Sequence, residues 1–277
     1  MIKEKIYILG IIGLGNMGSA LLSGVINSGF LKSEEIAVCD ADSEKVRKFE
    51  NIFKVKSFKN LKEIVLSSKY ILLAVKPQSV QDILPVFQEN CNIEKNVILS
   101  IAAGLSTNFF EKTIGDIPVI RIMPNAPALY NKGMSAISSG NFAQKKHMDF
   151  TEQLMRSVGT TVLLDEKHQN IATALSGSGP AYFFLFCKLM VDFAVEKGLD
   201  KETAKKMVIN TMLGAGKVLI KSEKTIDELI RAVTSPGGTT EKALNKFKES
   251  NLNKVFFEAL SAALNRSVEL ESVISKK

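Results

Sequence analysis

Tryptophan is absent from the 277 residues of this chain, and tyrosine and histidine are scarce, with four and two residues. The 36 lysines and arginines exceed the 29 acidic residues and give a net charge of +7, but they are scattered along the sequence. Nucleic-acid-binding surfaces usually combine clustered cations with aromatic side chains that stack on bases. The composition therefore argues against a nucleic-acid partner, and the excess positive charge favours solubility and attraction for anionic cofactors.

Cysteine is also rare, since the chain has only Cys39, Cys91 and Cys187. The three are far apart and none belongs to a Cys-x-x-Cys pair, so we expect reduced packing residues of a cytoplasmic protein, with no metal site. No uninterrupted apolar run reaches the ~18 residues of a membrane span. Lys188 and Asp192 interrupt the most apolar stretch. We therefore expect no membrane partner.

A glycine-rich turn follows the first apolar segment. Residues 5–12 form an apolar run of strand length, residues 13–18 read Gly-Leu-Gly-Asn-Met-Gly, and a helical pattern follows. In such a strand, turn and helix, Gly13 permits the tight turn, Gly15 lets backbone amides reach a pyrophosphate, and Gly18 lets the helix pack on the strand. The sequence therefore predicts a dinucleotide site at this turn.

Strand-like and helical runs alternate as far as residue 123. A run at 35–40 ends in Asp40 and closes a βαβ unit, and others follow at 51–56, 70–75, 96–101 and 118–123. Alternation predicts a parallel sheet covered on both faces, with ligands at the carboxyl ends of its strands. At these ends Lys76 is placed to meet a ribose or phosphate oxygen, and Asn125 to position a nicotinamide or substrate. A solvated lysine and an ordinary turn residue are the alternatives.

After Asp165 the periodicity is helical only. The predicted fold class is α/β, with an N-terminal Rossmann-like doubly wound sheet over residues 1–165, followed by an all-α dimerisation domain over residues 166–277. The helix expected from about residue 180 to residue 197 is apolar nearly all round, which is typical of burial between subunits. We therefore expect a homodimer through the helical part.

A second glycine-rich loop, Val233-Thr-Ser-Pro-Gly-Gly-Thr-Thr240, ends where another helical pattern begins. Pro236 fixes one φ angle, the glycines permit close approach, and the amides that open the helix have no partner within it. The loop therefore predicts a pocket for a carboxylate or phosphate. The alternative is an ordinary capped helix start, with Thr239 or Thr240 as the N-cap.

The catalytic residue patterns that are absent from the sequence limit the chemistry that it can support. The sequence shows no Ser-His-Asp set, metal-ligand cluster or Walker loop, and His147 and His168 do not follow strands. A nicotinamide site without a strong acid or base suits the reduction of an imine, whose nitrogen is protonated before hydride arrives. A hydroxyl such as that of Thr240 is enough to supply the hydrogen bond there.

The sequence resembles the pyrroline-5-carboxylate reductases over essentially the whole chain. The resemblance rests on residues 12–18, 74–77, 100–104, 123–128, 175–182 and 233–240, in the family's order, and the last two motifs are the most specific. It implies NAD(P)H-dependent reduction of the cyclic imine 1-pyrroline-5-carboxylate to L-proline, the last step of proline biosynthesis. It also implies helical domains that intertwine in a homodimer, and many members assemble further into rings of dimers.

The resemblance also implies roles for individual residues. Thr240 would be catalytic, through a hydrogen bond to the ring nitrogen. The residues expected to bind the substrate are Ser235, Gly237, Gly238, Thr239 and Thr240. With Asp40 and Asn125 from the argument above, the expected cofactor-binding residues are Gly13, Leu14, Gly15, Asn16, Met17, Gly18, Asp40, Ala74, Val75, Lys76, Pro77 and Asn125.

The cofactor is NADPH or NADH. Many relatives carry an arginine or a polar residue that receives the 2′-phosphate where this chain has Asp40-Ala41-Asp42. A carboxylate there repels that phosphate and accepts hydrogen bonds from a free ribose, so we expect NADH to be used as well as, or better than, NADPH. Lys45 and Arg47 lie nearby and are placed to compensate.

Two other functions stay open. A β-hydroxyacid-dehydrogenase-like oxidoreductase would share the glycine turn but needs a catalytic lysine followed by an asparagine, and Lys188 lacks that asparagine. A non-catalytic nicotinamide-nucleotide-sensing dimer would leave the loop at residues 235–240 unexplained.

Overall fold

The computed structural model describes residues 5–275, and the chain forms two compact units. The first unit runs to Ser178 and resumes at Ala263, and the second is Gly179–Ala262. This division differs from the boundary expected after residue 165. The reason is that Gln169, which lies beyond that boundary, is fully buried against the sheet, where its Nε2 donates to Ser138 Oγ at 2.9 Å.

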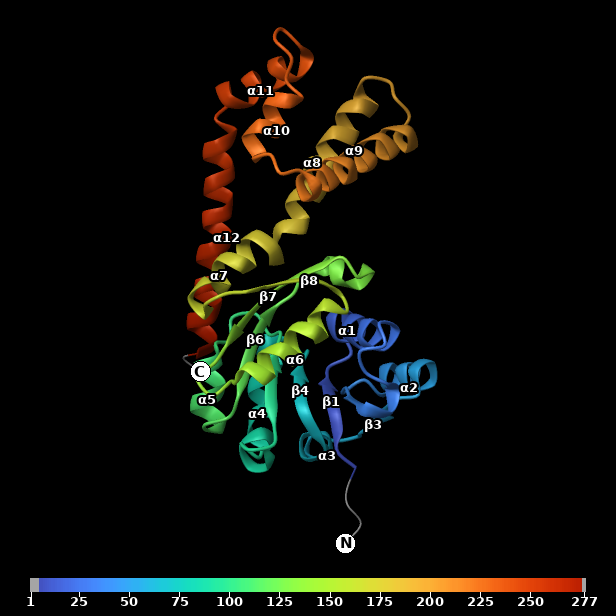
Figure 1. The fold of residues 1–277 in the computed structure, drawn as a ribbon, viewed down its shortest axis with the longest axis vertical. Coiled ribbons are helices and arrows are strands. Elements are labelled where there is room, and N and C mark those ends of the chain that lie inside the picture. The colour runs from blue at the N-terminus through green and yellow to red at the C-terminus, as the bar shows by residue number, and fades with distance from the viewer. Residues whose placement is uncertain (1–4, 276–277) are drawn as a thin grey trace. The chain divides into compact units, whose positions relative to one another are not determined.

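The first unit is built on one sheet with the strand order β3-β2-β1-β4-β5-β6-β7-β8 (Figure 1). The strands are β1 (Tyr7–Ile12), β2 (Ile36–Cys39), β3 (Lys56–Ser57), β4 (Ser68–Leu73), β5 (Val97–Ser100), β6 (Val119–Met123), β7 (Gly133–Ser139) and β8 (Gly159–Leu163). The pairs from β3 through β6 are parallel. The doubly wound sheet predicted for this part of the chain is therefore confirmed.

Helices cover both faces of the sheet, as its buried apolar strands require. The helices of this unit are α1 (Asn16–Asn27), α2 (Ser43–Phe53), α3 (Leu61–Ser67), α4 (Pro77–Asn90), α5 (Thr107–Ile114), α6 (Lys145–Arg156), α7 (Gln169–Ala172) and, from Ala263 on, the last part of α12 (Leu252–Ser275). Leu21 of α1 and Leu154 of α6 belong to the core on one face, whereas Ile64 of α3 and Phe87 of α4 belong to the core on the other.

Two details of the sheet differ from the sequence-based expectation. The strand expected at 51–56 is wrong for most of its length, because α2 continues to Phe53, where Phe49 and Phe53 stack one helical turn apart. Strands β7 and β8 were not expected, and β7 runs antiparallel to β6. The connection from β6 to β7 is short and contains the 3-10 helix η2 (Ala126–Tyr130). It has no room for the crossover that a parallel neighbour needs.

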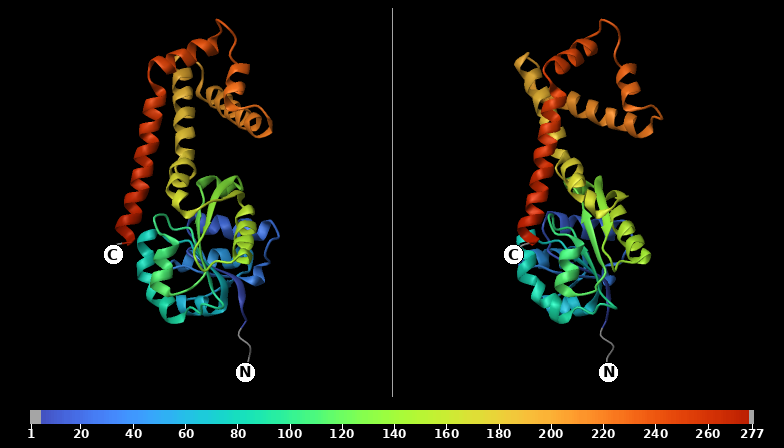
Figure 2. Two further views of the ribbon diagram at one scale, coloured as in Figure 1. Left: turned by 60° about the vertical axis from the view of Figure 1, so that its left-hand side comes forward. Right: turned by 90° about the vertical axis from the view of Figure 1, so that its left-hand side faces the viewer.

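The second unit is helical, as predicted. It contains α8 (Gly179–Glu196), α9 (Lys201–Lys221), α10 (Ile226–Ala232), α11 (Thr239–Glu249) and the first part of α12 (Leu252–Ser275), which is one continuous helix (Figure 2). Helix α8 packs on α9 and on the start of α12, where Phe186 stacks on Phe256.

Large apolar side chains are nevertheless exposed on the second unit. Phe183, Phe184 and Phe193 of α8 are 62%, 64% and 62% exposed. By length and hydropathy alone, the helical run Glu166–Glu196 also passes for a membrane span, although we had expected the charges at Lys188 and Asp192 to exclude one. A single such helix is weak evidence for a membrane, because a helix that packs in a protein interface has the same composition.

Candidate active site

The glycine turn joins β1 to α1 in the first unit. Gly13 has a φ of +99°, and its N–H donates to the carbonyl of Cys39 at 2.8 Å. A Cβ on Gly13 would lie 2.7 Å from the carbonyl oxygen of Ala74, and a Cβ on Gly18 would overlap the carbonyl oxygen of Gly13. A Cβ on Gly15, in contrast, would meet no atom within 4 Å. Two of the glycines are therefore required by packing, and the third faces open space.

Helix α1 begins at this open position. Its N-cap is Gly15, no side chain caps the first turn, and Asn16 is exposed. The first amides of a helix carry partial positive charge and have no partner within it. The start of α1 can therefore receive a pyrophosphate, and the residues present fit a dinucleotide.

Asp40 lies at the end of β2, beside the glycine turn. Its Oδ2 accepts from the Leu14 amide at 2.5 Å and its Oδ1 accepts from the Asp42 amide at 2.8 Å. Asp42 caps α2 and pairs with Lys45, whose Nζ lies 3.4 Å from Asp42 Oδ2. These contacts fix Asp40 next to the turn and leave Lys45 paired with a carboxylate.

The residues after β4 complete this edge of the sheet. The Ala74 amide donates to the carbonyl of Ile12 at 2.8 Å, so Ala74 lies directly beside the glycine turn. Lys76 is exposed and is the N-cap of α4, and Pro77 occupies the first helical position, which its fixed φ favours. The structure therefore brings residues 13–18, Asp40 and Ala74 together, as the motifs predicted.

Asn125 uses its side-chain amide within the protein. Its Nδ2 donates to the carbonyl of Ser176 at 3.1 Å, and its Oδ1 accepts from the Met134 amide at 2.9 Å. Ser176 belongs to the π-helical turn η4 (Thr173–Gly177), and a Cβ on Gly177 would lie 2.5 Å from Met123 Cε. Asn125 thus joins the end of β6 to β7 and η4, and its expected cofactor contact stays a prediction.

The second glycine-rich loop lies at the start of α11 in the second unit. Gly237 has a φ of +71°, and the Gly238 amide donates to the carbonyl of Ser235 at 3.0 Å. The N-cap is Gly238, and no side chain caps the first turn. The alternative in which Thr239 or Thr240 is the N-cap is therefore wrong, because both lie inside the helix. The amides that open α11 can receive a carboxylate.

Glu241 was not expected to take part in this loop. Its Oε2 accepts from the Gly237 amide at 2.7 Å, so one amide of the loop is bound by a carboxylate of the chain itself. The signal in the sequence was its position three residues after the N-cap, where an acidic side chain commonly reaches back to a free amide.

The remaining titratable candidates give no sign of catalysis. Burial lowers the pKa of His147, with smaller contributions from Lys146 and Lys69, and its Nδ1 accepts from the Gln144 amide at 3.1 Å. Burial raises the pKa of Cys39, and it raises the pKa of Cys91 to about 12, so both thiols stay protonated at neutral pH. Within residues 5–275 there is no group of three or more side chains that could hold a metal ion.

The sheet and its glycine turn define a Rossmann-type nicotinamide-dependent oxidoreductase with a helical second part. Two family models match the chain, one described as NADP oxidoreductase coenzyme F420-dependent, over residues 8–104, and one described as pyrroline-5-carboxylate reductase dimerisation, over residues 166–270.

Similarity to individual proteins extends over nearly the whole chain. The pyrroline-5-carboxylate reductase of Pseudomonas aeruginosa is 35% identical over 264 residues, which are 95% of this chain and 96% of that one. The structure of the Coxiella burnetii pyrroline-5-carboxylate reductase aligns with a TM-score of 0.87 at 32% identity, over 96% of this chain and 99% of that one. The NADP-bound pyrroline carboxylate reductase of Plasmodium falciparum aligns with a TM-score of 0.85 at 28% identity, over 97% and 99%. The chain belongs to the pyrroline-5-carboxylate reductase family.

Proposed function

We propose that this protein reduces 1-pyrroline-5-carboxylate to L-proline with NAD(P)H, the last step of proline biosynthesis. The observation that carries the proposal is the loop at the start of α11, whose first helical amides no side chain caps, in a chain that matches this family over 95% of its length. A substrate with one carboxylate and one protonated ring nitrogen needs one anion site and one hydrogen-bond acceptor for the ring N–H. The loop and the hydroxyl of Thr240 supply these.

In the proposed mechanism, the first glycine-rich segment binds the dinucleotide and the second binds the substrate. A bound nicotinamide would supply a hydride to the imine carbon, and the electron pair of the C=N bond would pass to the protonated nitrogen. Gly13, Gly15 and Gly18 shape the turn that holds the pyrophosphate. The hydroxyl of Ser235 and the amide and hydroxyl of Thr239 hold the substrate carboxylate, and the Gly237 amide joins them when the substrate displaces Glu241. Gly238 shapes the loop, with its amide bound to the carbonyl of Ser235. Thr240 orients the ring nitrogen, and orientation is the main contribution that this reaction requires from the protein.

We also propose that NADH is accepted as well as NADPH or better. The support is the carboxylate of Asp40, fixed beside the turn by two backbone amides, together with the pairing of Lys45 with Asp42. A 2′-phosphate would meet negative charge there, whereas a ribose hydroxyl can donate to a carboxylate. Activity with NADPH about tenfold above that with NADH, equal to ~1.4 kcal/mol, would show that Asp40 does not select the cofactor.

The helical part forms the homodimer. We propose that residues 166–277 provide dimerisation and the substrate loop, residues 1–165 bind the dinucleotide, and dimers assemble further into a ring in the cytoplasm. The exposed phenylalanines of α8 support a second copy as the cover of this surface, in preference to lipid. Light scattering of the purified protein without detergent tests this, and a monomer, or a requirement for detergent, would contradict it.

The decisive experiment measures initial rates of NADH and NADPH oxidation by the purified protein, with and without 1-pyrroline-5-carboxylate. Oxidation that depends on the imine is expected. Nucleotide binding without turnover would contradict the reductase and favour the sensing dimer.

A further inference from the structure

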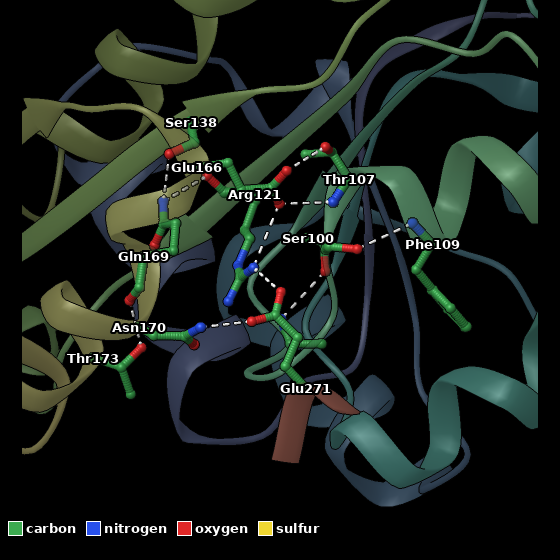
Figure 3. Close-up of polar contacts among 12 residues, drawn as sticks. Ser100, Thr107, Phe109, Arg121, Ser138, Glu166, Gln169, Asn170, Thr173 and Glu271 are labelled. Carbon is green, nitrogen blue, oxygen red and sulfur yellow. Dashed lines mark hydrogen bonds and ion pairs between the residues drawn. The ribbon is translucent and has the colours of Figure 1, made fainter. Parts of the chain in front are cut away.

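A buried polar cluster joins the last turns of α12 to the sheet of the first unit (Figure 3). Arg121 lies on β6 at its centre, and its side chain is only 5% exposed. Its Nη1 lies 3.4 Å from Glu166 Oε1 and 2.8 Å from Glu271 Oε1. Asn170 Nδ2 donates to Glu271 Oε2 at 2.6 Å. Both carboxylate oxygens of Glu271 are therefore bound inside the first unit, and the mechanism above uses none of these four side chains.

The cluster supports the loop between β5 and α5, residues 101–106. Glu166 accepts from the Thr107 amide at 2.7 Å and from Thr107 Oγ1 at 2.6 Å, directly after this loop. Gly104 lies within the loop at a φ of +76°, and a Cβ there would lie 3.3 Å from the amide nitrogen of Glu271. The turn of α12 that carries Glu271 therefore packs on the backbone of the loop.

The same loop lies at the edge of the sheet that the dinucleotide is expected to occupy. The Ile101 amide donates to the carbonyl of Leu73 at 3.2 Å, and the next residue, Ala74, lies beside the glycine turn. The strands β2, β1, β4 and β5 are neighbours in this order. In a Rossmann-type site the pyrophosphate lies after β1 and the adenosine ribose lies at the acidic residue after β2, here Asp40. This leaves the ends of β4 and β5, on the other side of the turn, for the nicotinamide half.

Stability alone is a weak explanation for the ion pairs of this cluster. A buried ion pair is often no more stabilising than apolar residues of similar volume, and its best-attested use is to specify one geometry. Ser267 is buried one helical turn before Glu271, on the same face of α12, and its Oγ donates to Asn170 Oδ1 at 2.7 Å. Two side chains of α12 therefore fix where its last turns lie against Gly104.

We propose that Glu271 is a positioning residue for the nicotinamide half of the cofactor, because it fixes the turn of α12 that supports the loop at residues 101–106. Without this support the loop samples more conformations. Part of the binding free energy is then spent on ordering the loop, so the nicotinamide half binds more weakly. All the contacts that carry this inference lie within the first unit. The inference rests on the proposed use of NAD(P)H, but it does not require turnover of the imine.

The test compares nucleotide binding by two alanine variants of the full-length protein. Glu271→Ala removes the contacts to Arg121 and Asn170, but Glu166 stays beside Arg121, so the buried cation keeps a partner. Glu269→Ala is the matched control, because Glu269 is exposed and pairs with Arg266 at 2.9 Å. We expect the Kd of NADH to rise about tenfold in Glu271→Ala, while the Kd of ADP-ribose, which lacks the nicotinamide, stays within about twofold of wild type. The control should change neither.

Hydrogen exchange of the nucleotide-free protein gives a second readout. Amides of residues 101–106 should exchange faster in Glu271→Ala than in Glu269→Ala. A purely structural role would lower the free energy of unfolding and leave the ratio of the two dissociation constants unchanged. An NADH affinity equal to that of the control, or equal losses of affinity for NADH and ADP-ribose, would therefore overturn the proposal.

Two further outcomes are also decisive. If Glu271→Ala does not fold, Ser267→Ala replaces it, with a smaller rise of about threefold expected in the Kd of NADH, and an unchanged Kd refutes the idea. A wild-type protein that binds NADH but shows no imine-dependent oxidation would refute the reductase and leave this inference standing. A wild-type protein that does not bind NADH would refute the inference.

Discussion

Alanine substitutions at two glycines of the first turn separate ligand binding from folding. A Cβ on Gly18 would overlap the carbonyl oxygen of Gly13 and lie 3.1 Å from the Cβ of Ala74, so Gly18→Ala must displace the turn. Overpacking of this kind costs about 1–3 kcal/mol. A Cβ on Gly15 meets no protein atom within 4 Å, and the φ of −67° at this position suits alanine. Gly15→Ala should therefore change the free energy of unfolding by less than about 0.5 kcal/mol.

Nucleotide affinity should follow a different order from stability. In Gly15→Ala the new methyl group occupies space that the pyrophosphate needs, so we expect NADH to bind at least about tenfold more weakly, a loss of ~1.4 kcal/mol. In Gly18→Ala affinity and the free energy of unfolding should fall together. Urea unfolding and a fluorescence titration with NADH measure the two quantities on the same samples. A Gly15→Ala protein that titrates like wild type would show that the start of α1 does not face the pyrophosphate.

Three further predictions concern single side chains. Thr240→Ala should lower kcat by about 10–100-fold with little change in NADH affinity, as expected for a lost hydrogen bond to a charged nitrogen, and equal turnover would remove the role of Thr240. Glu241→Gln should lower KM for the imine about threefold, because the loop then holds no competing charge, and Glu249→Gln at the other end of α11 should not. His147 binds a proton less readily in the folded state than its ordinary pKa of 6.5 implies, so the free energy of unfolding should fall as pH drops below 6.5, and urea midpoints should show a flatter pH dependence in His147→Gln.

The fold was predictable where local patterns agree with tertiary structure. The first strand, the glycine turn and α1 follow one another in sequence, and their chemistry is local. The expected strand at 51–56 is wrong because the apolar residues at 52 and 53 continue a helix that begins earlier, where Asp42 caps α2 by accepting from the amides of Glu44 and Lys45. The residues of strand β8 are half-buried or exposed, so its sequence contains no buried apolar run that would predict a strand.

The part of the candidate site around the glycine turn was predictable from the sequence, whereas contacts between distant segments were not. Residues 13–18, Asp40 and Ala74 come together because the ends of neighbouring parallel strands meet at one edge of the sheet. Arg121 and Glu271 were not paired in advance, since they lie 150 positions apart and no local pattern joins them. The contact of Asn125 with Ser176 was not predictable, although Ser176 belongs to the motif at residues 175–182, because the π-helical turn that presents its carbonyl has no signature in the sequence.

A glycine at the N-cap distinguishes the two candidate anion-binding loops from the other helix starts whose N-cap residue is described. Five helix starts in the described chain are closed by a side chain that accepts from the first-turn amides; these caps are Asp42 on α2, Asn60 on α3, Ser106 on α5, Asp200 on α9 and Thr225 on α10. Helices α1 and α11 start at Gly15 and Gly238, and neither has a side-chain cap. An uncapped start leaves amides for which a ligand can compete, and a side-chain cap at N-cap is worth about 0.5–2 kcal/mol. Helices α4 and α7 also lack a side-chain cap, but their N-cap residues are Lys76 and His168. A glycine at the N-cap leaves the first amides uncovered by any side chain, and this favours ligand binding at the two glycine-rich segments of the proposed site.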